Sequence, residues 1–265
     1  VNGLLREAGL DRRELTVDEV MAREPTLRGD IIGGFWTESD STGDIHKFTV
    51  GLADWLQKQG VTFRLGVPVT DLQLRDDGVY VESGDETRFD GIVISAGVAS
   101  RKFAAKLGDR VNIYPVKGYS ITVHLTDAAS QAAAPTTSLL DDKAKIVTSR
   151  LGQDRLRIAG TAEFNGENRD ILERRVRPLI QWCETHFPDV STEACVPWAG
   201  LRPMMPNMMP RVGQGRNDRV FYNTGHGHLG WTLSPATADA IGATIAARLK
   251  SNSKPRYDLK SASIV

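Results

Sequence analysis

A glycine- and histidine-rich segment, residues 223–233, is the part of the chain whose composition most directly suggests chemistry. It follows the apolar run 220–223, carries glycines at 225, 227 and 230, and precedes an alanine-rich stretch that runs to Leu249. Glycine permits left-handed backbone and lets the chain approach a ligand closely. A helix beginning after the loop would present unpaired N–H groups and a partial positive charge. The segment predicts a site for a phosphate or an electron-rich ring, and a glycine-rich turn without ligand is the alternative.

The apolar stretch 197–206 contains one arginine, Arg202, between Leu201 and Pro203. A guanidinium group in such surroundings needs a partner, and its planar fork binds a carboxylate through two parallel hydrogen bonds. This suits the capture of a small amino or hydroxy acid. A structural salt bridge explains the same pattern equally well.

Three further groups were considered and carry less. Lys117 and Tyr119 flank Gly118, which taken alone indicates only a kinked strand. His226 and His228 are two residues apart, a spacing that favours hydrogen bonding within a loop over a metal site. The methionines near Arg202 favour apolar packing over pocket lining.

Known catalytic motifs are absent from the sequence. It contains no GxSxG, no HExxH and no P-loop lysine motif, and no GxGxxG near its start. Cys183 and Cys195 have neither CxxC nor Cys/His spacing, so we expect buried or reduced thiols. We therefore predict no catalytic side chain and no metal ligand.

The periodicity predicts a two-layer α/β or α+β fold. Apolar residues at helical spacing from Asp44 predict a helix that ends at Gly60, followed by a strand at 61–65. A hairpin follows, with strands at 69–74 and 79–81 and a turn at 76–78. The run 89–97 is typical of a buried parallel strand that enters a tight loop, with a short helix near 100–107. Segments 111–125, 145–150 and 155–164 predict an antiparallel sheet. Residues 1–30 resemble a connector. A helix is predicted over 168–187, and Pro178 should kink it or split it in two. The last helix should begin with Ser234 as its cap and Pro235 in its first turn.

Composition excludes other classes of protein. The 265 residues carry 33 basic and 33 acidic side chains, with no basic block of the kind that neutralises nucleic-acid phosphates. Apolar runs are far shorter than the roughly 20 residues that span a bilayer. We expect neither nucleic acid as a partner nor a transmembrane segment, and no signal peptide is recognisable at Val1. The expected location is cytoplasmic.

The order of several motifs resembles a known family. The motifs are Gly43-Asp44 with Phe48-Thr49 and Leu52, Ile94-Ser95-Ala96-Gly97, Pro115-Val116-Lys117-Gly118-Tyr119-Ser120, Gly200-Leu201-Arg202-Pro203-Met204, and Asn223-Thr224-Gly225-His226-Gly227 with Leu229-Gly230-Trp231-Thr232. Together they resemble the small subunit of bacterial D-amino acid dehydrogenases, within the glycine oxidase and D-amino acid oxidase superfamily of FAD enzymes. The resemblance implies oxidation of a D-amino acid to a 2-oxo acid and ammonia by hydride transfer to the flavin, with a quinone or another acceptor taking the electrons.

The resemblance also implies roles for particular residues. The substrate would contact Arg202 through its carboxylate, with Tyr119, Lys117 and His226 nearby. The cofactor-binding residues would be Pro68, Val69, Ala96, Gly97, Gly200, Gly225, His226, Gly227, His228, Leu229, Gly230, Trp231 and Thr232. Pro68 and Val69 would meet the adenine end, and the loop 225–232 would lie along the flavin ring.

Two departures from the family pattern matter. The GxGxxG unit that holds the FAD pyrophosphate is missing, so a second subunit or a missing N-terminal half is expected to supply it. Where the family has Pro-Asp-Gly, this chain has Pro206-Asn207-Met208. The expected domains are the remainder of an incomplete Rossmann-like FAD layer, residues 1–110 and 210–265, and a substrate domain with an antiparallel sheet, residues 111–209. There are two alternatives: a sister flavin amine oxidase that acts on glycine, sarcosine or an opine, and a flavin-free fragment. Peripheral attachment to the inner membrane is implied by the resemblance alone.

Overall fold

The computed structural model describes residues 2–251 and 263–264. The helices are α1 (Asn2–Glu7), α2 (Val17–Arg23), α3 (Ile45–Lys58), α4 (Ser100–Lys106), α5 (Ala128–Ala133), α6 (Glu173–His186) and α7 (Gly230–Ser251), with a 3₁₀ turn η1 (Gly97–Ala99). The strands are β1 (Arg12–Leu15), β2 (Gly34–Thr37), β3 (Thr62–Phe63), β4 (Asp71–Arg75), β5 (Gly78–Glu82), β6 (Glu86–Phe89), β7 (Ile92–Ile94), β8 (Tyr114–His124), β9 (Leu140–Asp141), β10 (Ile146–Arg150), β11 (Arg155–Glu163), β12 (Cys195–Met204), β13 (Arg211–Gln214), β14 (Val220–Thr224) and β15 (Ser263–Ile264). The mixed fold class expected from the sequence is confirmed.

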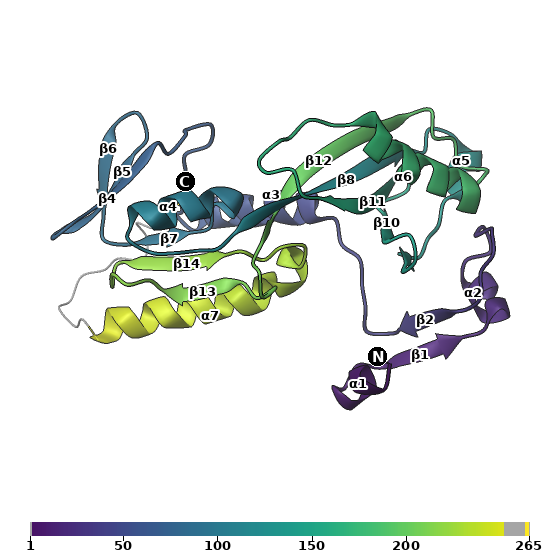
Figure 1. Ribbon diagram of the computed structural model, residues 1–265, viewed down its shortest axis with the longest axis horizontal. Coiled ribbons are helices and arrows are strands. Elements are labelled where there is room, and N and C mark those ends of the chain that lie inside the picture. The colour runs from purple at the N-terminus through teal and green to yellow at the C-terminus, as the bar shows by residue number, and fades with distance from the viewer. Residues whose placement is uncertain (1, 252–262, 265) are drawn as a thin grey trace. The chain divides into compact units, whose positions relative to one another are not determined.

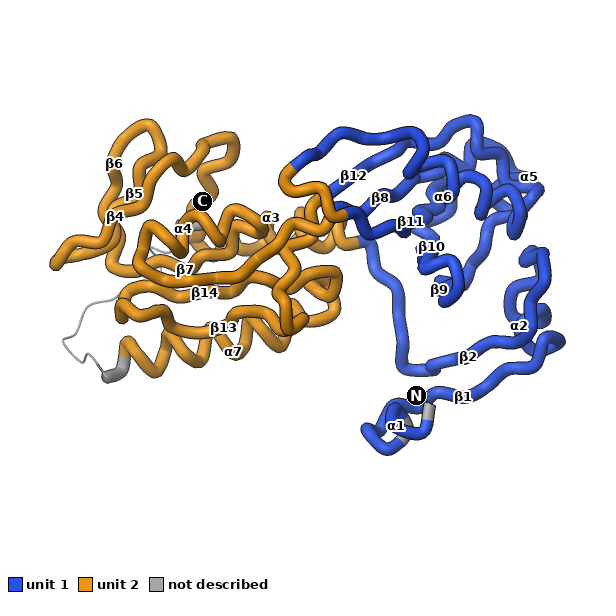
Figure 2. The backbone as a smooth tube through the Cα atoms, viewed as in Figure 1, with its two compact units in different colours: residues 1–44, 117–163, 168–200 blue, residues 45–116, 164–167, 201–265 orange. Residues whose placement is uncertain are grey.

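The chain divides into two compact units, coloured separately in Figure 2. Unit 1 comprises residues 1–44, 117–163 and 168–200, and unit 2 comprises residues 45–116, 164–167 and 201–265. Residues 1–44 thus group with the segments of the large sheet, whereas the sequence grouped them with the FAD layer. The assignment of the units to cofactor and substrate remains a proposal.

Unit 1 is built on a five-stranded sheet in the order β12-β8-β11-β10-β9. The β8–β11 and β11–β10 pairs are antiparallel, as the sequence predicted, and the short strand β9, which it did not predict, pairs antiparallel with β10. Helix α6 packs on the sheet through Val176, Leu179 and Cys183, against Leu156 and Ile158 of β11 (Figure 1). These side chains form one apolar core, because the 3.6-residue period of the helix and the two-residue period of the strand place them on facing surfaces.

Unit 2 contains the predicted parallel strand. β7 pairs in parallel with β14, β14 pairs antiparallel with β13, and the three form one sheet. Ile94, Val220 and Tyr222 pack against Ala104 and Leu107, at and just after the end of α4. β4, β5 and β6 form an antiparallel meander after the predicted helix α3. The order of helix, strand and hairpin deduced for residues 44–82 is confirmed.

The N-terminal region corrects the expectation of a mere connector. β1 and β2 pair antiparallel, and α2 begins in a capping box in which the Thr16 side chain accepts from Glu19 N–H and the Glu19 carboxylate accepts from Thr16 N–H. Buried Glu24 follows the helix and accepts hydrogen bonds from the backbone N–H groups of Thr136 and Thr137. The Thr-x-x-Glu pattern was the available signal, but the long-range partners of Glu24 were not readable from the sequence.

Two helices also differ at their starts. α6 runs unbroken through Pro178 but begins at Glu173, since Asn168 and Asp170 are hydrogen-bonded in the preceding loop. α7 begins at Gly230, so Pro235 lies inside it and Ser234 is not its cap. The Ser234 hydroxyl donates to the carbonyl of Trp231 at 2.9 Å. It therefore satisfies the acceptor that Pro235, without an N–H, leaves open.

Candidate functional site

The carboxyl ends of the parallel strands β7 and β14 form the centre of the candidate site. β7 leads into Ala96 and Gly97, and β14 leads into the loop 225–229. The Ser100 and Thr224 hydroxyls hydrogen-bond to each other at 2.8 Å in the interior, and Ser100 Oγ also accepts from Ala96 N–H at 3.0 Å. These bonds tie the two loops together. Open α/β sheets bind ligands outside the carboxyl ends of their strands, and both predicted cofactor loops lie there.

The glycine loop needs its glycines. Gly225 and Gly227 have φ values of 79° and 59°, and Gly97 in the neighbouring loop has 55°. A Cβ on Gly225 would lie 2.7 Å from Met205 Cγ, and one on Gly227 would lie 2.5 Å from Met204 Sδ. Both the left-handed backbone and the close packing on the end of β12 disfavour larger residues here.

The end of β12 holds this loop in place. Gly227 N–H donates to the Pro203 carbonyl at 3.0 Å, and Met204 and His226 form an isolated antiparallel bridge. Arg211, the first residue of β13, pairs with Thr224. The loop is therefore attached at several backbone positions within unit 2.

Polar groups at this edge support an anionic or polar ligand. α7 begins at Gly230 directly after the loop, so its first N–H groups and its positive dipole end face the edge of the sheet. Asn223 is the last residue but one of β14, and its Oδ1 is buried without a hydrogen-bond donor among the described residues. A buried unpaired oxygen is costly, and a bound group that donates to it would remove that cost.

The two histidines of the loop differ. His226 is half-buried, and its Nε2 lies 3.2 Å from the Thr237 hydroxyl. Burial lowers the pKa of His226 below its ordinary value, so the ring is neutral at pH 7. His228 is exposed, as are Leu229 and Thr232. Trp231 packs edge to face on Phe48 of α3, with ring centroids 5.0 Å apart.

Arg202 lies on β12, partly buried, close in the chain to the residues that anchor the loop. It belongs to unit 2 with the loop. Gly200, on the same strand, makes room for the indole ring of Trp198, which would overlap any Cβ there. Pro68 is exposed before β4, and Val69 packs against the apolar core of unit 2.

Lys117 and Tyr119 lie in unit 1, in a buried polar cluster. Lys117 Nζ contacts Glu163 Oε2 at 3.1 Å, Asn168 Oδ1 at 2.9 Å and the Asp170 carbonyl at 3.1 Å. The Tyr119 hydroxyl donates to the same Glu163 oxygen at 2.8 Å. Both side chains are almost wholly inaccessible, and their polar atoms are directed at protein groups.

The electrostatics of this cluster favour full ionisation. Burial alone would lower the pKa of Lys117, but its interactions with Tyr119 and Glu163 outweigh burial and raise that pKa. The hydrogen bond from Tyr119 and the interactions with Lys117 and Arg175 lower the pKa of Glu163, against the opposing effect of burial. The pair is a charged, hydrogen-bonded unit at neutral pH.

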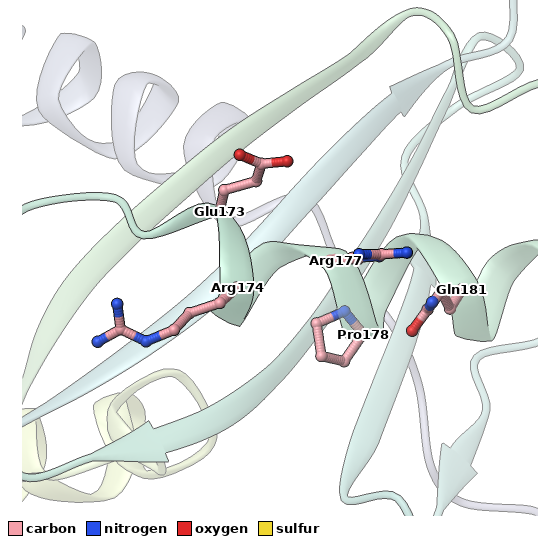
Figure 3. A pocket seen from close by; sticks show the side chains of 5 residues that line it. All are labelled: Glu173, Arg174, Arg177, Pro178 and Gln181. Atoms are coloured by element: carbon pink, nitrogen blue, oxygen red, sulfur yellow. The ribbon is translucent and has the colours of Figure 1, made fainter.

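A groove of about 480 Å³ runs along α6 and contains no predicted site residue. Figure 3 shows the side chains of Arg174 and Arg177 pointing in opposite directions, so they do not converge on a common ligand. Within residues 2–251 and 263–264, no three His, Cys, Asp or Glu side chains are placed to hold a metal ion. In the same part of the chain, no helix has the length and apolarity to cross a bilayer.

Sequence reasoning thus identified the residues of the loops but not those that connect them. The structure brings Ala96 and Gly97 close to the start of the segment 225–232 through the Ser100–Thr224 hydrogen bond, and Arg202 lies on the strand that anchors the loop. Asn223 and Thr224 belong to the segment that the sequence singled out, whereas Ser100, which bonds to Thr224, was not among the predicted site residues. The only sequence signal for Ser100 was a hydroxyl residue three positions after Gly97, in the loop that follows β7.

Comparison with known proteins identifies the family. The family model described as "FAD dependent oxidoreductase" matches residues 2–244. The chain belongs to this family. FAD is the family's cofactor, and the glycine loops, the α7 N-terminus and the unpaired Asn223 oxygen are compatible with part of its site.

The curated relatives are longer than this chain. It is 58% identical over 253 residues to D-amino acid dehydrogenase 3 of Mesorhizobium japonicum, covering 94% of this chain and 61% of that protein. It is 40% identical over 257 residues to the D-amino acid dehydrogenase of Dechloromonas aromatica, covering 92% of this chain and 60% of the relative. The chain therefore spans about three fifths of these relatives' length. Glycine oxidase from Geobacillus kaustophilus has a similar fold, with a TM-score of 0.82 at 21% identity over 97% of this chain and 70% of that one.

The departure at Met208 has a structural consequence. Met208 has a φ of 61°, in the left-handed region that favours glycine, and its N–H donates to the Met205 carbonyl at 3.0 Å. We expect Met208→Gly to raise the free energy of unfolding by about 1 kcal/mol, because the left-handed conformation costs a residue with a Cβ roughly that amount. Urea denaturation measures the change.

Met209→Gly is the matched control. Met209 is also exposed, at 64%, but does not have a positive φ, so the same substitution should lower stability through added freedom of the unfolded chain. Equal effects at the two positions would contradict the assignment of strain to Met208.

Proposed function

We propose that the protein catalyses the FAD-dependent oxidative deamination of D-amino acids to 2-oxo acids and ammonia. The observation that carries the proposal is that the loops after β7 and β14 are hydrogen-bonded to each other in unit 2. Arg202 lies on β12, the strand that holds the loop after β14. The named relatives at 58% and 40% identity support the substrate class.

In this proposal the chain binds and orients the cofactor along the loop 225–232. Bound FAD supplies the two-electron acceptor. The N-terminus of α7 and the loop N–H groups other than those of Gly227 and Leu229, which donate to the Pro203 and His226 carbonyls, would stabilise negative charge on the flavin ring. Ala96 and Gly97 would support the dinucleotide, and Asn223 Oδ1 would receive a donor. Pro68 and Val69 are assigned to the adenine end. Gly200, with Trp198 packed over it, contributes only a close backbone approach.

Arg202 is assigned to the substrate carboxylate, which it holds through charge-assisted hydrogen bonds. His226 is neutral at pH 7, so it acts as a hydrogen-bonding group rather than a second cation. Tyr119 acts on the substrate only indirectly, because its hydroxyl donates its hydrogen bond to the Glu163 carboxylate. No side chain of this chain is assigned as acid, base or nucleophile, and positioning and exclusion of water account for the protein's contribution.

The proposed site is completed by a dinucleotide-binding unit, either preceding this region in a longer polypeptide or on a second subunit. Two apolar features support this. No side chain of α3 is buried, and Ile45, Phe48, Leu52 and Trp55 share one exposed apolar face. β7 ends its sheet among the described strands, with Val93 41% exposed. Exposed apolar surface of this kind is typical of an interface.

The electron acceptor in this proposal is a quinone or another carrier, in keeping with the word dehydrogenase in the relatives' names. A quinone acceptor would require contact with the membrane, so the proposed location is cytoplasmic with peripheral attachment to the inner membrane. An oxidase acting on glycine, sarcosine or an opine is the second candidate, supported by the fold shared with glycine oxidase.

The test is a turnover assay of the full-length protein with bound FAD. We expect D-alanine to reduce an artificial dye acceptor while little peroxide forms in air. Peroxide production at the same rate would favour the oxidase, and turnover of glycine in preference to every D-amino acid would overturn the proposed substrate class.

A further inference from the structure

The chain passes between the two units five times, after residues 44, 116, 163, 167 and 200. Lys117 is the first residue of unit 1 after the second passage, Glu163 is the last before the third, and Asn168 is the first after the fourth. One ammonium group contacts both of the other two, Glu163 Oε2 at 3.1 Å and Asn168 Oδ1 at 2.9 Å. Three passages therefore start or end at residues that share a single buried contact.

The backbone is distorted to make this contact. β8 and β11 pair as Gly160↔Tyr119 and then as Glu163↔Lys117, so one extra residue is inserted in β11 between these pairs. Thr161 lies at the insertion with a φ of 64°. A left-handed conformation is unfavourable for a β-branched residue and persists only where the surroundings impose it. The bulge places Glu163, rather than Ala162, opposite Lys117.

The remaining contacts close the cluster. Lys117 Nζ also donates to the Asp170 carbonyl, Tyr119 shares Glu163 Oε2, and Arg175 Nε contacts Glu163 Oε1 at 3.2 Å from the first turn of α6. Lys117 is 0% exposed and Glu163 8% exposed. Every donor of the ammonium group thus has an acceptor within unit 1, which leaves none for a substrate carboxylate.

From this geometry we infer that Lys117 is a positioning residue that anchors the linkage between the two units and does not contact the substrate. It fixes the end of β11 and the start of the segment that precedes α6, and thereby the points at which the chain leaves unit 1 and returns to it. The kinetic part of the inference rests on the proposed function, because Arg202, the residue assigned to the substrate, lies on β12, the neighbour of β8, which carries Lys117. The structural part does not.

Native-state trypsin cleavage after Arg169 tests the anchor independently of activity. Arg169 is exposed and lies between Asn168 and Asp170, both bound by Lys117. In the full-length FAD-loaded protein, Lys117→Met should speed this cleavage at least about tenfold, because cleavage follows local opening. Lys143→Met, the same change at an exposed lysine of unit 1, should leave the rate unchanged. Mass spectrometry identifies the cut.

The same variants are then assayed with D-alanine. If Lys117 is an anchor, Lys117→Met should lower kcat about tenfold and change KM by no more than about twofold, because misalignment of the substrate affects the chemical step more than binding. If Lys117→Met does not fold, Asn168→Ala removes one partner at an exposed position and should show the same pattern at about fivefold. A KM raised a hundredfold with unchanged proteolysis would overturn the inference in favour of a substrate contact. Absence of turnover of D-alanine and of every other D-amino acid by the wild type would reject the proposed function, while the proteolysis comparison would still decide the anchor.

Discussion

Replacing Arg202 with alanine in the full-length FAD-loaded protein is expected to lower kcat/KM for D-alanine by about 100- to 1,000-fold. Two parallel charge-assisted hydrogen bonds to a carboxylate at this partly exposed position, each contributing about 1.5–2 kcal/mol, correspond to a loss of this size. The loss should appear mainly in KM, since the carboxylate is held alike throughout the reaction. Steady-state kinetics with a dye acceptor measures both constants.

Two controls accompany this variant. Arg202→Lys keeps the charge but loses the planar fork, so its kcat/KM should lie between the wild type and alanine. Arg216→Ala removes an arginine that is 81% exposed in the same unit, and it should leave both constants unchanged. An unaltered KM for D-alanine in Arg202→Ala would mean that Arg202 forms the structural salt bridge of the alternative reading.

Gly227→Val is expected to raise the dissociation constant for FAD by about 100-fold or more. Its Cβ would lie 2.5 Å from Met204 Sδ at a φ of 59°. The left-handed strain costs about 1–2 kcal/mol, and moving the loop off the Pro203 carbonyl displaces the N–H groups assigned to the flavin. Titration of the apoprotein with FAD, followed by flavin fluorescence, measures the constant.

Gly242→Ala is the matched control for this loop variant. Gly242 lies within α7, where a Cβ meets nothing within 4 Å and φ is not positive. FAD affinity should be unchanged and helix stability slightly higher, because alanine is the better helix former. Equal FAD affinity in Gly227→Val and Gly242→Ala would remove the loop from the cofactor site.

The sequence predicted those parts of the fold in which local pattern decides. Local pattern gave the correct element in five places: the apolar spacing of α3, the apolar run of β7, and the β-branched segments of β8, β10 and β11. Thr16-x-x-Glu19 is also a local signal, since a capping box marks the start of a helix. Pro235 was misplaced because the compensating hydroxyl of Ser234 depends on helix geometry, which the residue type alone does not reveal.

The long-range partners could not be predicted. The sequence assigned Lys117 and Tyr119 to the substrate because of the motif in which they occur. Their partner Glu163 lies 46 residues beyond Lys117 and faces it only through a one-residue bulge at Thr161. A bulge shifts the register of a strand pair, and a glycine at its left-handed position is the usual sequence signal for it. Here that position is Thr161, so the signal is missing. Met208 keeps a left-handed φ of 61° although a residue with a Cβ adopts it at a cost, which the departure from Pro-Asp-Gly left open.

The most direct test of the proposed function is the visible spectrum of the full-length FAD-bound protein without oxygen, before and after addition of D-alanine and, separately, L-alanine. The account predicts that D-alanine bleaches the flavin band and that L-alanine leaves it unchanged. A flavin band that persists with D-alanine and with every other D-amino acid tested would contradict it.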